Sequence, residues 1–212
     1  MREANVTDAA VKRCKYFYDT EFIDDGKLIH LVSLGIVCED SREYYAQNLG
    51  CPFAEASDWV FRYVYPHLNH FKFPGGRDCK QLGTESRRHP AVPFEAEAGR
   101  CPKPDCPWVN HYGIARELRA FIEVRPEEPE FWGYYPAYDH VVLAQLYGAM
   151  VHLPARWPKW TRDIKQWCEI LDDPELPAKP ASEHHALNDA RWVKTCHAFL
   201  SARQSRSSGA EP

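Results

Sequence analysis

The amino-acid sequence predicts an α/β domain in which a mixed β-sheet is flanked by helices. Two observations lead to this prediction. Strand-like segments follow one another at the start of the chain, and segments with helical periodicity alternate with an aromatic strand in its second half. The composition agrees, because 44% hydrophobic and 26% charged residues are typical of a globular domain that buries its own core.

Three strand-like segments open the chain, at residues 15–22, 28–38 and 42–47. Turn residues separate them, and connections this short favour antiparallel pairing. Further along, the periodicity predicts helices at 54–65, 114–122, 139–148, 161–171 and 182–202, the last with Ser182 as its N-cap, and strands at 131–137 and near Trp157.

The segment from about residue 70 to 107 has no regular pattern. Prolines, glycines and charged residues dominate it, so we expect a long irregular insertion on the surface. We expect residues 1–14 to be an N-terminal extension, 15–202 to be one domain that contains the insertion, and 203–212 to be a disordered polar tail.

Composition and charge exclude some classes of protein. No run of about 18 apolar residues could span a membrane, and the first residues lack the apolar segment of a signal peptide. We therefore expect a cytoplasmic protein with no membrane contact and with reduced cysteines. The net charge of −4 argues against a broad basic surface, but it allows a nucleic-acid substrate if some carboxylates bind divalent cations.

Asp19 and Glu21 lie two residues apart in the first expected strand, so their carboxylates project to the same face. An edge strand with a solvated face would explain this pair without any function. The first strand of such a sheet is usually central, however. Two acids in that position repel each other unless a divalent cation lies between them.

Three further polar residues lie where a site could form. Asp139 lies where the aromatic strand passes into a helix, at the sheet edge where α/β proteins form their sites, although a helix N-cap is the alternative. Asp189 shares the buried stripe of the last helix with Val193 and Leu200, where an unpaired acid is costly. His184 cannot share that face, so it acts from the first turn or the loop before it, unless it is only a surface residue.

These four acids and one histidine suit the hydrolysis of a phosphodiester by a two-metal mechanism. Carboxylates would hold two ions roughly 3.5–4 Å apart, and the ions would offset the charge of the scissile phosphate. Histidine has a pKa suited to taking a proton from the attacking water.

The same residues resemble the motifs of the DEDDh exonuclease superfamily. Asp19 and Glu21 match its first motif, Asp139 its second, and the segment His-x-Ala-Leu-x-Asp-Ala, with His184 and Asp189, its third. Within the superfamily the chain looks most like the RNase AS group, the actinobacterial polyadenylate-specific 3′-exoribonucleases. The resemblance covers roughly residues 15–68, 110–172 and 180–200, and residues 70–107 have no counterpart in it.

The resemblance implies a ribonuclease H-like fold and a 3′–5′ exoribonuclease that forms a homodimer. Such an enzyme would release nucleoside 5′-monophosphates from the 3′ end of single-stranded RNA, with a preference for adenine, and would bind two Mg²⁺ or Mn²⁺ ions in each active site.

The resemblance also implies a role for each site residue. Asp19 would bridge both ions, Glu21 and Asp189 would complete the site of the ion that activates water, and Asp139 would support the second ion through water. His184 would be the general base. The terminal nucleotide would be bound by Phe22, Ile23 and Tyr138.

Two other functions remain open from the sequence. One is a DNA exonuclease of the same superfamily, because the acids recognise phosphate and not the 2′-hydroxyl. The other is an RNA-binding module without catalysis, ordered by structural Zn²⁺ in the insertion. The spacing of Cys101 and Cys106 suits zinc, with Cys79, His89 and His111 nearby, although free thiols on a flexible loop are the favoured explanation of the pair.

Overall fold

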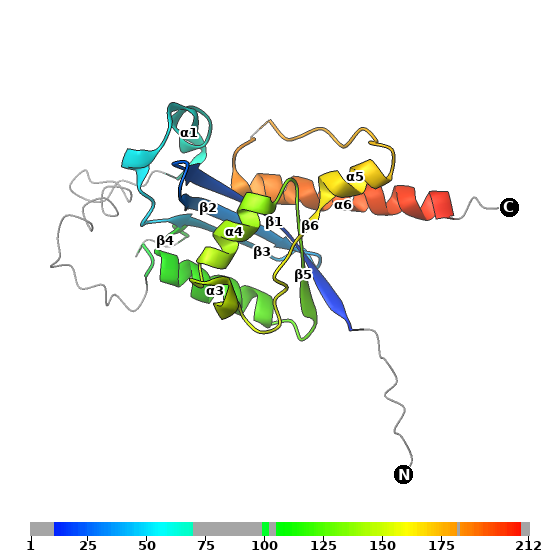
Figure 1. The fold of residues 1–212 in the computed structure, drawn as a ribbon, viewed down its shortest axis with the longest axis horizontal. Coiled ribbons are helices and arrows are strands. Elements are labelled where there is room, and N and C mark those ends of the chain that lie inside the picture. The colour runs from blue at the N-terminus through cyan, green and yellow to red at the C-terminus, as the bar shows by residue number, and fades with distance from the viewer. Residues whose placement is uncertain (1–10, 70–98, 102–104, 182, 209–212) are drawn as a thin grey trace, which may run out of the picture.

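The computed structural model describes residues 11–69, 99–101, 105–181 and 183–208, and within them six strands form one mixed sheet (Figure 1). The strand order is β4-β3-β2-β1-β5-β6. β2 pairs antiparallel with both β1 and β3, as the short connections predict, whereas β4, β5 and β6 run parallel to β3, β1 and β5. The strands are β1 (Arg13–Asp24), β2 (Ile29–Cys38), β3 (Glu43–Asn48), β4 (Trp108–Val109), β5 (Glu128–Gly133) and β6 (Arg162–Asp163).

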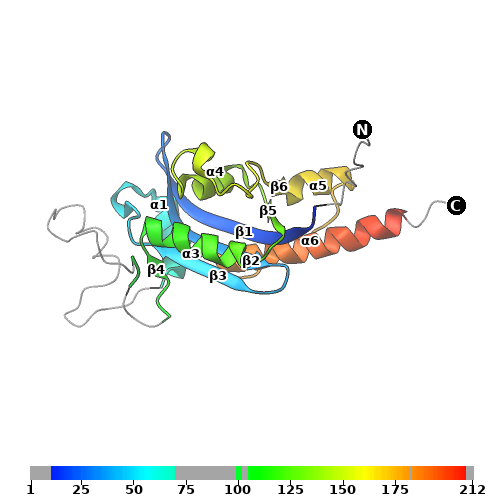
Figure 2. The same cartoon turned by 90° about the horizontal axis from the view of Figure 1, so that it is seen from below.

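Helices cover both faces of this sheet because the central strand is buried on both sides. Tyr16 and Tyr18 of β1 pack against α3 (His111–Glu123) and α4 (Ala137–Gln145), whereas Phe17 packs against α5 (Ile164–Ile170) and α6 (Ala186–Ser208). This alternation follows from the two-residue period of a strand. α6 lies along β1 and β2, and its last turns extend beyond the sheet (Figure 2). No helix in the described ranges is long and apolar enough to cross a membrane.

The expected helix over 54–65 is wrong in its length. The segment forms η1 (Phe53–Glu55), α1 (Asp58–Tyr63) and η2 (Tyr65–His67), because the Ser57 hydroxyl accepts a hydrogen bond from the Val60 N–H and starts a new helix. Val60 is buried. Trp59 and Tyr63 are 49% and 42% exposed and therefore do not belong to the core.

Other boundaries also differ from expectation. Trp157 is a buried core residue after η3 (Met150–His152), and the short strand is β6 instead. The last helix begins at Ala186 and continues to Ser208, so the disordered tail expected from residue 203 is wrong for residues 203–208. The N-cap Ser182, residues 1–10 and 209–212, and most of the expected insertion (70–98 and 102–104) lie outside the described residues.

Candidate active site

The first two acids lie on β1, a central strand of the sheet. β1 lies between β2 and β5, and Glu21 is only 7% exposed, so the explanation by an edge strand with a solvated face is wrong. Pairing with β5 ends at Phe17, opposite Trp132. Beyond that point β1 pairs with β2 only. Asp19 and Glu21 point to the same face of the sheet as Phe17, toward α6.

The start of α6 brings the third acid to this strand. A glycine permits the approach: a Cβ at Gly35 would overlap the backbone of Ala186 and Leu187, the first residues of α6. Gly35 lies directly opposite Asp19 in the β1–β2 pair. One turn into the helix, Asp189 thereby reaches the other two acids, and ligand oxygens of Asp19, Glu21 and Asp189 all lie within 4.8 Å of one another.

Asp139 approaches β1 from α4, which covers the face of the sheet opposite to α6. It lies in the first turn of α4, where Pro136 occupies the N-cap position, so the N-cap explanation is wrong. One carboxylate oxygen, Oδ1, accepts hydrogen bonds from both the backbone N–H of Thr20 (2.8 Å) and its hydroxyl (2.7 Å). Thr20 stands between the two acids of β1, and these bonds therefore hold Asp139 next to them.

His184 lies in the turn before α6, as its helical angle to Asp189 requires. Its backbone is left-handed (φ 67°), and its N–H donates a 2.9 Å hydrogen bond to Oδ2 of Asp189. The imidazole ring packs edge-on against Trp59, with ring centroids 4.8 Å apart, and contacts Tyr63 at 6.0 Å. The two exposed aromatic residues of α1 therefore lie beside the histidine and orient its ring.

The acids and His184 line one cavity of about 190 Å³, and its electrostatics favour a cation. Burial, together with the charges of Asp139, Glu21 and Asp189, raises the pKa of Asp19 well above its usual value. Burial and the neighbouring carboxylates raise the pKa of Glu21 to about 8. Lys179, which also lines the cavity, opposes both shifts with its positive charge.

One further observation tests whether divalent cations fit here. Asp189 is 8% exposed, and its Oδ1 is buried without a hydrogen-bond partner among the described residues. An orphaned carboxylate oxygen costs free energy unless something electropositive meets it. Oxygen ligands from several carboxylates are what Mg²⁺ and Mn²⁺ prefer. The residues present therefore fit such ions.

The residues expected to bind a nucleotide divide into two groups. Phe22 and Tyr138 lie together at the edge of the site, with their rings nearly parallel (13°) and centroids 5.9 Å apart. Tyr138 is 52% exposed and can meet a ligand. Ile23 is only 1% exposed and packs in the core beside η1 and α1, and its contact with the nucleotide stays a prediction.

The cysteine pair of the insertion is not on an exposed loop. Cys101 and Cys106 are both buried in the cluster around Trp108, which contradicts the explanation by thiols on a flexible loop. Cys79 and His89 lie outside the described residues. Within the described part of the chain no third ligand accompanies the pair, so zinc in the insertion stays a prediction.

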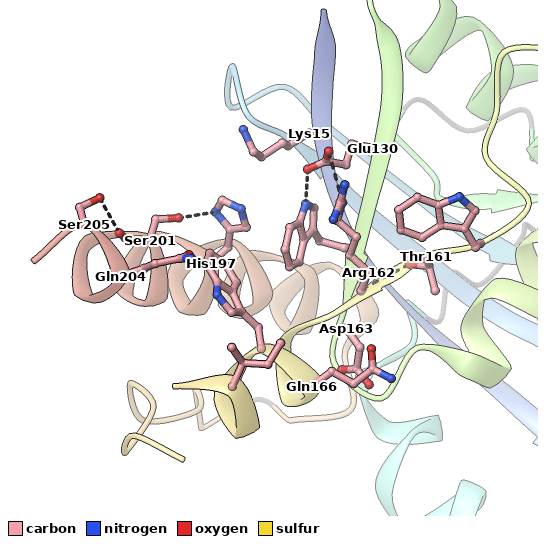
Figure 3. A pocket seen from close by; sticks show the side chains of 14 residues that line it. Lys15, Glu130, Thr161, Arg162, Asp163, Gln166, His197, Ser201, Gln204 and Ser205 are labelled. Carbon is pink, nitrogen blue, oxygen red and sulfur yellow. Dashed lines mark hydrogen bonds and ion pairs between the residues drawn. The ribbon is translucent and has the colours of Figure 1, made fainter. Parts of the chain in front are cut away.

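A larger cavity of about 890 Å³ opens between β6, α5 and the second half of α6 (Figure 3). Its two acids already have partners. Glu130 accepts a hydrogen bond from the Trp132 indole (2.8 Å) and pairs with Arg162 (3.2 Å), and Asp163 accepts from backbone N–H groups. With its carboxylates satisfied, this cavity has less need of a cation than the smaller one, which is our candidate active site.

Sequence reasoning missed several residues that shape the site. Thr20 and Gly35 carried no signal of their own, since their importance depends on which elements they face. Lys179 and Trp192 line the cavity, and the Lys179 ammonium lies 5.1 Å from the Trp192 ring centroid. Lys179 comes from the irregular segment before α6, whose position could not be derived from periodicity.

The fold is of the ribonuclease H-like class. The structure is similar to that of S. pombe Pop2p in its Mg²⁺- and Mn²⁺-bound form, with a TM-score of 0.55, 12% sequence identity, and coverage of 93% of this chain and 86% of that one. The expected ribonuclease H-like fold is thereby confirmed.

Sequence comparison gives the family. Residues 95–200 match the model of the 3′-5′ exoribonuclease Rv2179c-like domain. Two proteins of Mycobacterium tuberculosis, 3′-5′ exoribonuclease Rv2179c of strain H37Rv and 3′-5′ exoribonuclease MT2234.1 of strain CDC 1551, are each 35% identical over 178 residues, which is 84% of this chain and 87% of theirs. The chain belongs to the Rv2179c-like 3′-5′ exoribonuclease family.

Proposed function

We propose that this protein is a DEDDh-type 3′–5′ exoribonuclease that removes nucleoside 5′-monophosphates from the 3′ end of single-stranded RNA, with two Mg²⁺ or Mn²⁺ ions in its site. The observation that carries this proposal is the convergence of Asp19, Glu21 and Asp189 around an orphaned carboxylate oxygen. Family membership supports the RNA substrate and the direction of attack.

The charges of the other three acids all act on Asp19. Asp19, Glu21 and Asp189 would hold the ion that activates water, and Asp139 would support the second ion. Because one oxygen of Asp139 is occupied by Thr20, only the second is open to a ligand or to water. The ions would lower the pKa of the attacking water and offset the charge of the scissile phosphate.

The side chains of the chain perform the remaining steps. His184 takes the proton of the attacking water, and Trp59 holds the imidazole in place at the edge of the cavity. Phe22 and Tyr138 contact the terminal nucleotide with their ring faces. Lys179 contributes positive charge next to the phosphate, where the acids alone would repel the substrate.

Adenine preference and dimer formation are part of the same proposal and rest on the resemblance to the RNase AS group. The first predicts faster shortening of an RNA with an adenine tail than of the same RNA with a uracil, cytosine or guanine tail. The second predicts twice the chain mass in light scattering after size exclusion. Zinc in the insertion would appear as bound metal that is lost when Cys101 and Cys106 are both replaced by serine.

The test is degradation of a 5′-labelled single-stranded RNA with Mg²⁺, compared between the wild type and Asp189→Asn. The introduced amide keeps an oxygen that can accept from the His184 N–H but removes the charge. We expect a ladder that shortens from the 3′ end and mononucleotide products from the wild type, none after chelation, and a loss of at least about 100-fold in the variant. Asp173→Asn, which removes an exposed acid after α5, is the matched control and should retain full activity.

Two results would contradict the proposal. Internal fragments would indicate an endonuclease. Equal degradation of a DNA oligonucleotide of the same sequence would favour the deoxyribonuclease alternative, and an RNA with a single 3′-terminal deoxynucleotide would show whether the 2′-hydroxyl is recognised.

A further inference from the structure

A second group of metal-ligating side chains lies at the tip of the β1–β2 hairpin, outside the candidate active site. It consists of Asp25 in the turn after β1, His30 in β2 and Glu55 in η1. One ligand atom from each lies within 4.8 Å of the other two. The imidazole Nε2 of His30 is 3.7 Å from Oδ2 of Asp25 and 3.6 Å from Oε2 of Glu55.

These distances are too long for hydrogen bonds but suit a shared cation. Ligands bonded at 2.0–2.2 Å to a tetrahedral ion lie about 3.4 Å apart, close to the spacing seen here. Nε2 of His30 is itself buried, and no hydrogen-bond partner satisfies it within the described residues. The imidazole nitrogen lies at ion-pair distance from both carboxylates without a hydrogen bond to either, an arrangement that a cation held among the three groups would satisfy.

The backbone of the hairpin fixes the orientation of the Asp25 carboxylate before any ion binds. Oδ1 of Asp25 accepts hydrogen bonds from the backbone N–H groups of Leu28 (2.7 Å) and Lys27 (2.8 Å), which leaves Oδ2 directed toward His30. Those bonds, that from Leu28 first, also lower the pKa of Asp25, so it is ionised at neutral pH. One ligand is thus fixed before any ion binds, which reduces the entropy lost on binding.

We propose that Asp25, His30 and Glu55 form a second cation site, selective for a transition-metal dication such as Zn²⁺. Imidazole nitrogen favours Zn²⁺ over Mg²⁺, whereas the all-carboxylate cluster at Asp19 favours Mg²⁺ or Mn²⁺. The ion would be held by three protein ligands, with water at its remaining position. This inference does not depend on the nuclease activity.

A cation here would tie together segments that frame the active site. It would join the hairpin to η1, which leads within three residues to α1. Trp59 of α1 contacts the His184 ring. Zn²⁺ at the hairpin would therefore hold α1 in place, and with it the aromatic residues that orient the proposed base.

Calorimetric titration with Zn²⁺ tests the site in full-length protein carrying Asp19→Asn and Asp189→Asn, which disables the other cluster. We expect that adding Asp25→Asn or His30→Gln to this protein removes one equivalent of Zn²⁺ or weakens it at least about tenfold. The amide of the Asp25→Asn variant retains the oxygen that accepts the two backbone bonds, so the hairpin should still fold. Magnesium at the same concentration should not compete.

Asp24→Asn is the matched control, since it removes a charge from the same turn but keeps the acceptor for the Gly26 N–H. It should bind as much Zn²⁺ as the parent. The thermal midpoint should rise with Zn²⁺ in the parent and control but not in Asp25→Asn. Identical titrations of the parent, Asp25→Asn and His30→Gln would overturn the proposal.

Discussion

Gly35→Ala should damage the active site although Gly35 contains no catalytic group. The added methyl group would overlap backbone atoms of Ala186 and Leu187, and real Cβ contacts essentially never fall below 3.0 Å. Backbone cannot rotate away as a flexible side chain can, so α6 must retreat from β2 by on the order of 1 Å. Overpacking of this kind typically costs about 1–3 kcal/mol of unfolding free energy.

The displacement falls where the acids meet. Gly35 faces Asp19 across the sheet, and Asp189 lies one turn into the displaced helix. A shift of about 1 Å in a reacting group can cost about 100-fold in rate, so the loss of activity should exceed what the loss of stability explains. Urea unfolding gives the stability, and RNA degradation at saturating Mg²⁺, at a temperature where the variant is folded, gives the rate.

Gly50→Ala is the matched control for this experiment. A Cβ there meets only the Asn48 side chain, at an ordinary 3.5 Å. The control should retain wild-type rate and stability within about 0.5 kcal/mol. Wild-type activity in a folded Gly35→Ala protein would refute the argument, because it would mean that the approach of α6 to β2 does not position the acids.

Three further substitutions test other contacts. Thr20→Val removes the hydroxyl donor to Asp139 but keeps the backbone donor. Because one hydrogen bond to a charged group is lost, kcat should fall about tenfold, with little change in KM. Lys179→Met removes positive charge from the cavity and should raise KM for RNA and weaken its dependence on salt, measured as initial rates at several salt concentrations. Burial lowers the pKa of His197 from 6.5 to about 4, so between these pH values the unfolded chain binds a proton that the folded chain does not. The free energy of unfolding should therefore fall as the pH drops from about 6.5 to 4. Urea unfolding should show a smaller fall for His197→Phe.

The sequence predicted the fold well where local pattern and burial coincide. The first three strands were found because each is bounded by turn residues and buried on a regular face. β4 and β6 were missed because strands of two residues have no period to detect, and they form only by pairing with longer neighbours. The last helix continues beyond its predicted end, because exposed polar residues can continue a helix without a core face.

The acids of the site were predictable because they break the pattern of a buried element. Asp19 in a central strand and Asp189 on an apolar helix stripe contradict their surroundings, and such contradictions are typical of functional sites. Thr20, Gly35 and Trp59, by contrast, do not contradict the strand or helix in which they lie. Their contribution exists only after folding brings α4, α6 and α1 to β1, so no single-sequence pattern could have indicated it.

The same burial that makes these acids identifiable also opposes folding without cations. The pKa of Glu21 is raised to about 8, and Oδ1 of Asp189 has no hydrogen-bond partner among the described residues. Each of these features costs free energy that a solvated carboxylate would not. A sequence selected for stability alone would replace them with apolar residues of similar volume. The proposed cations would recover this cost on binding, so their affinity would depend on the strain of the site without them. Function, not packing, therefore accounts for these acids in the centre of the sheet.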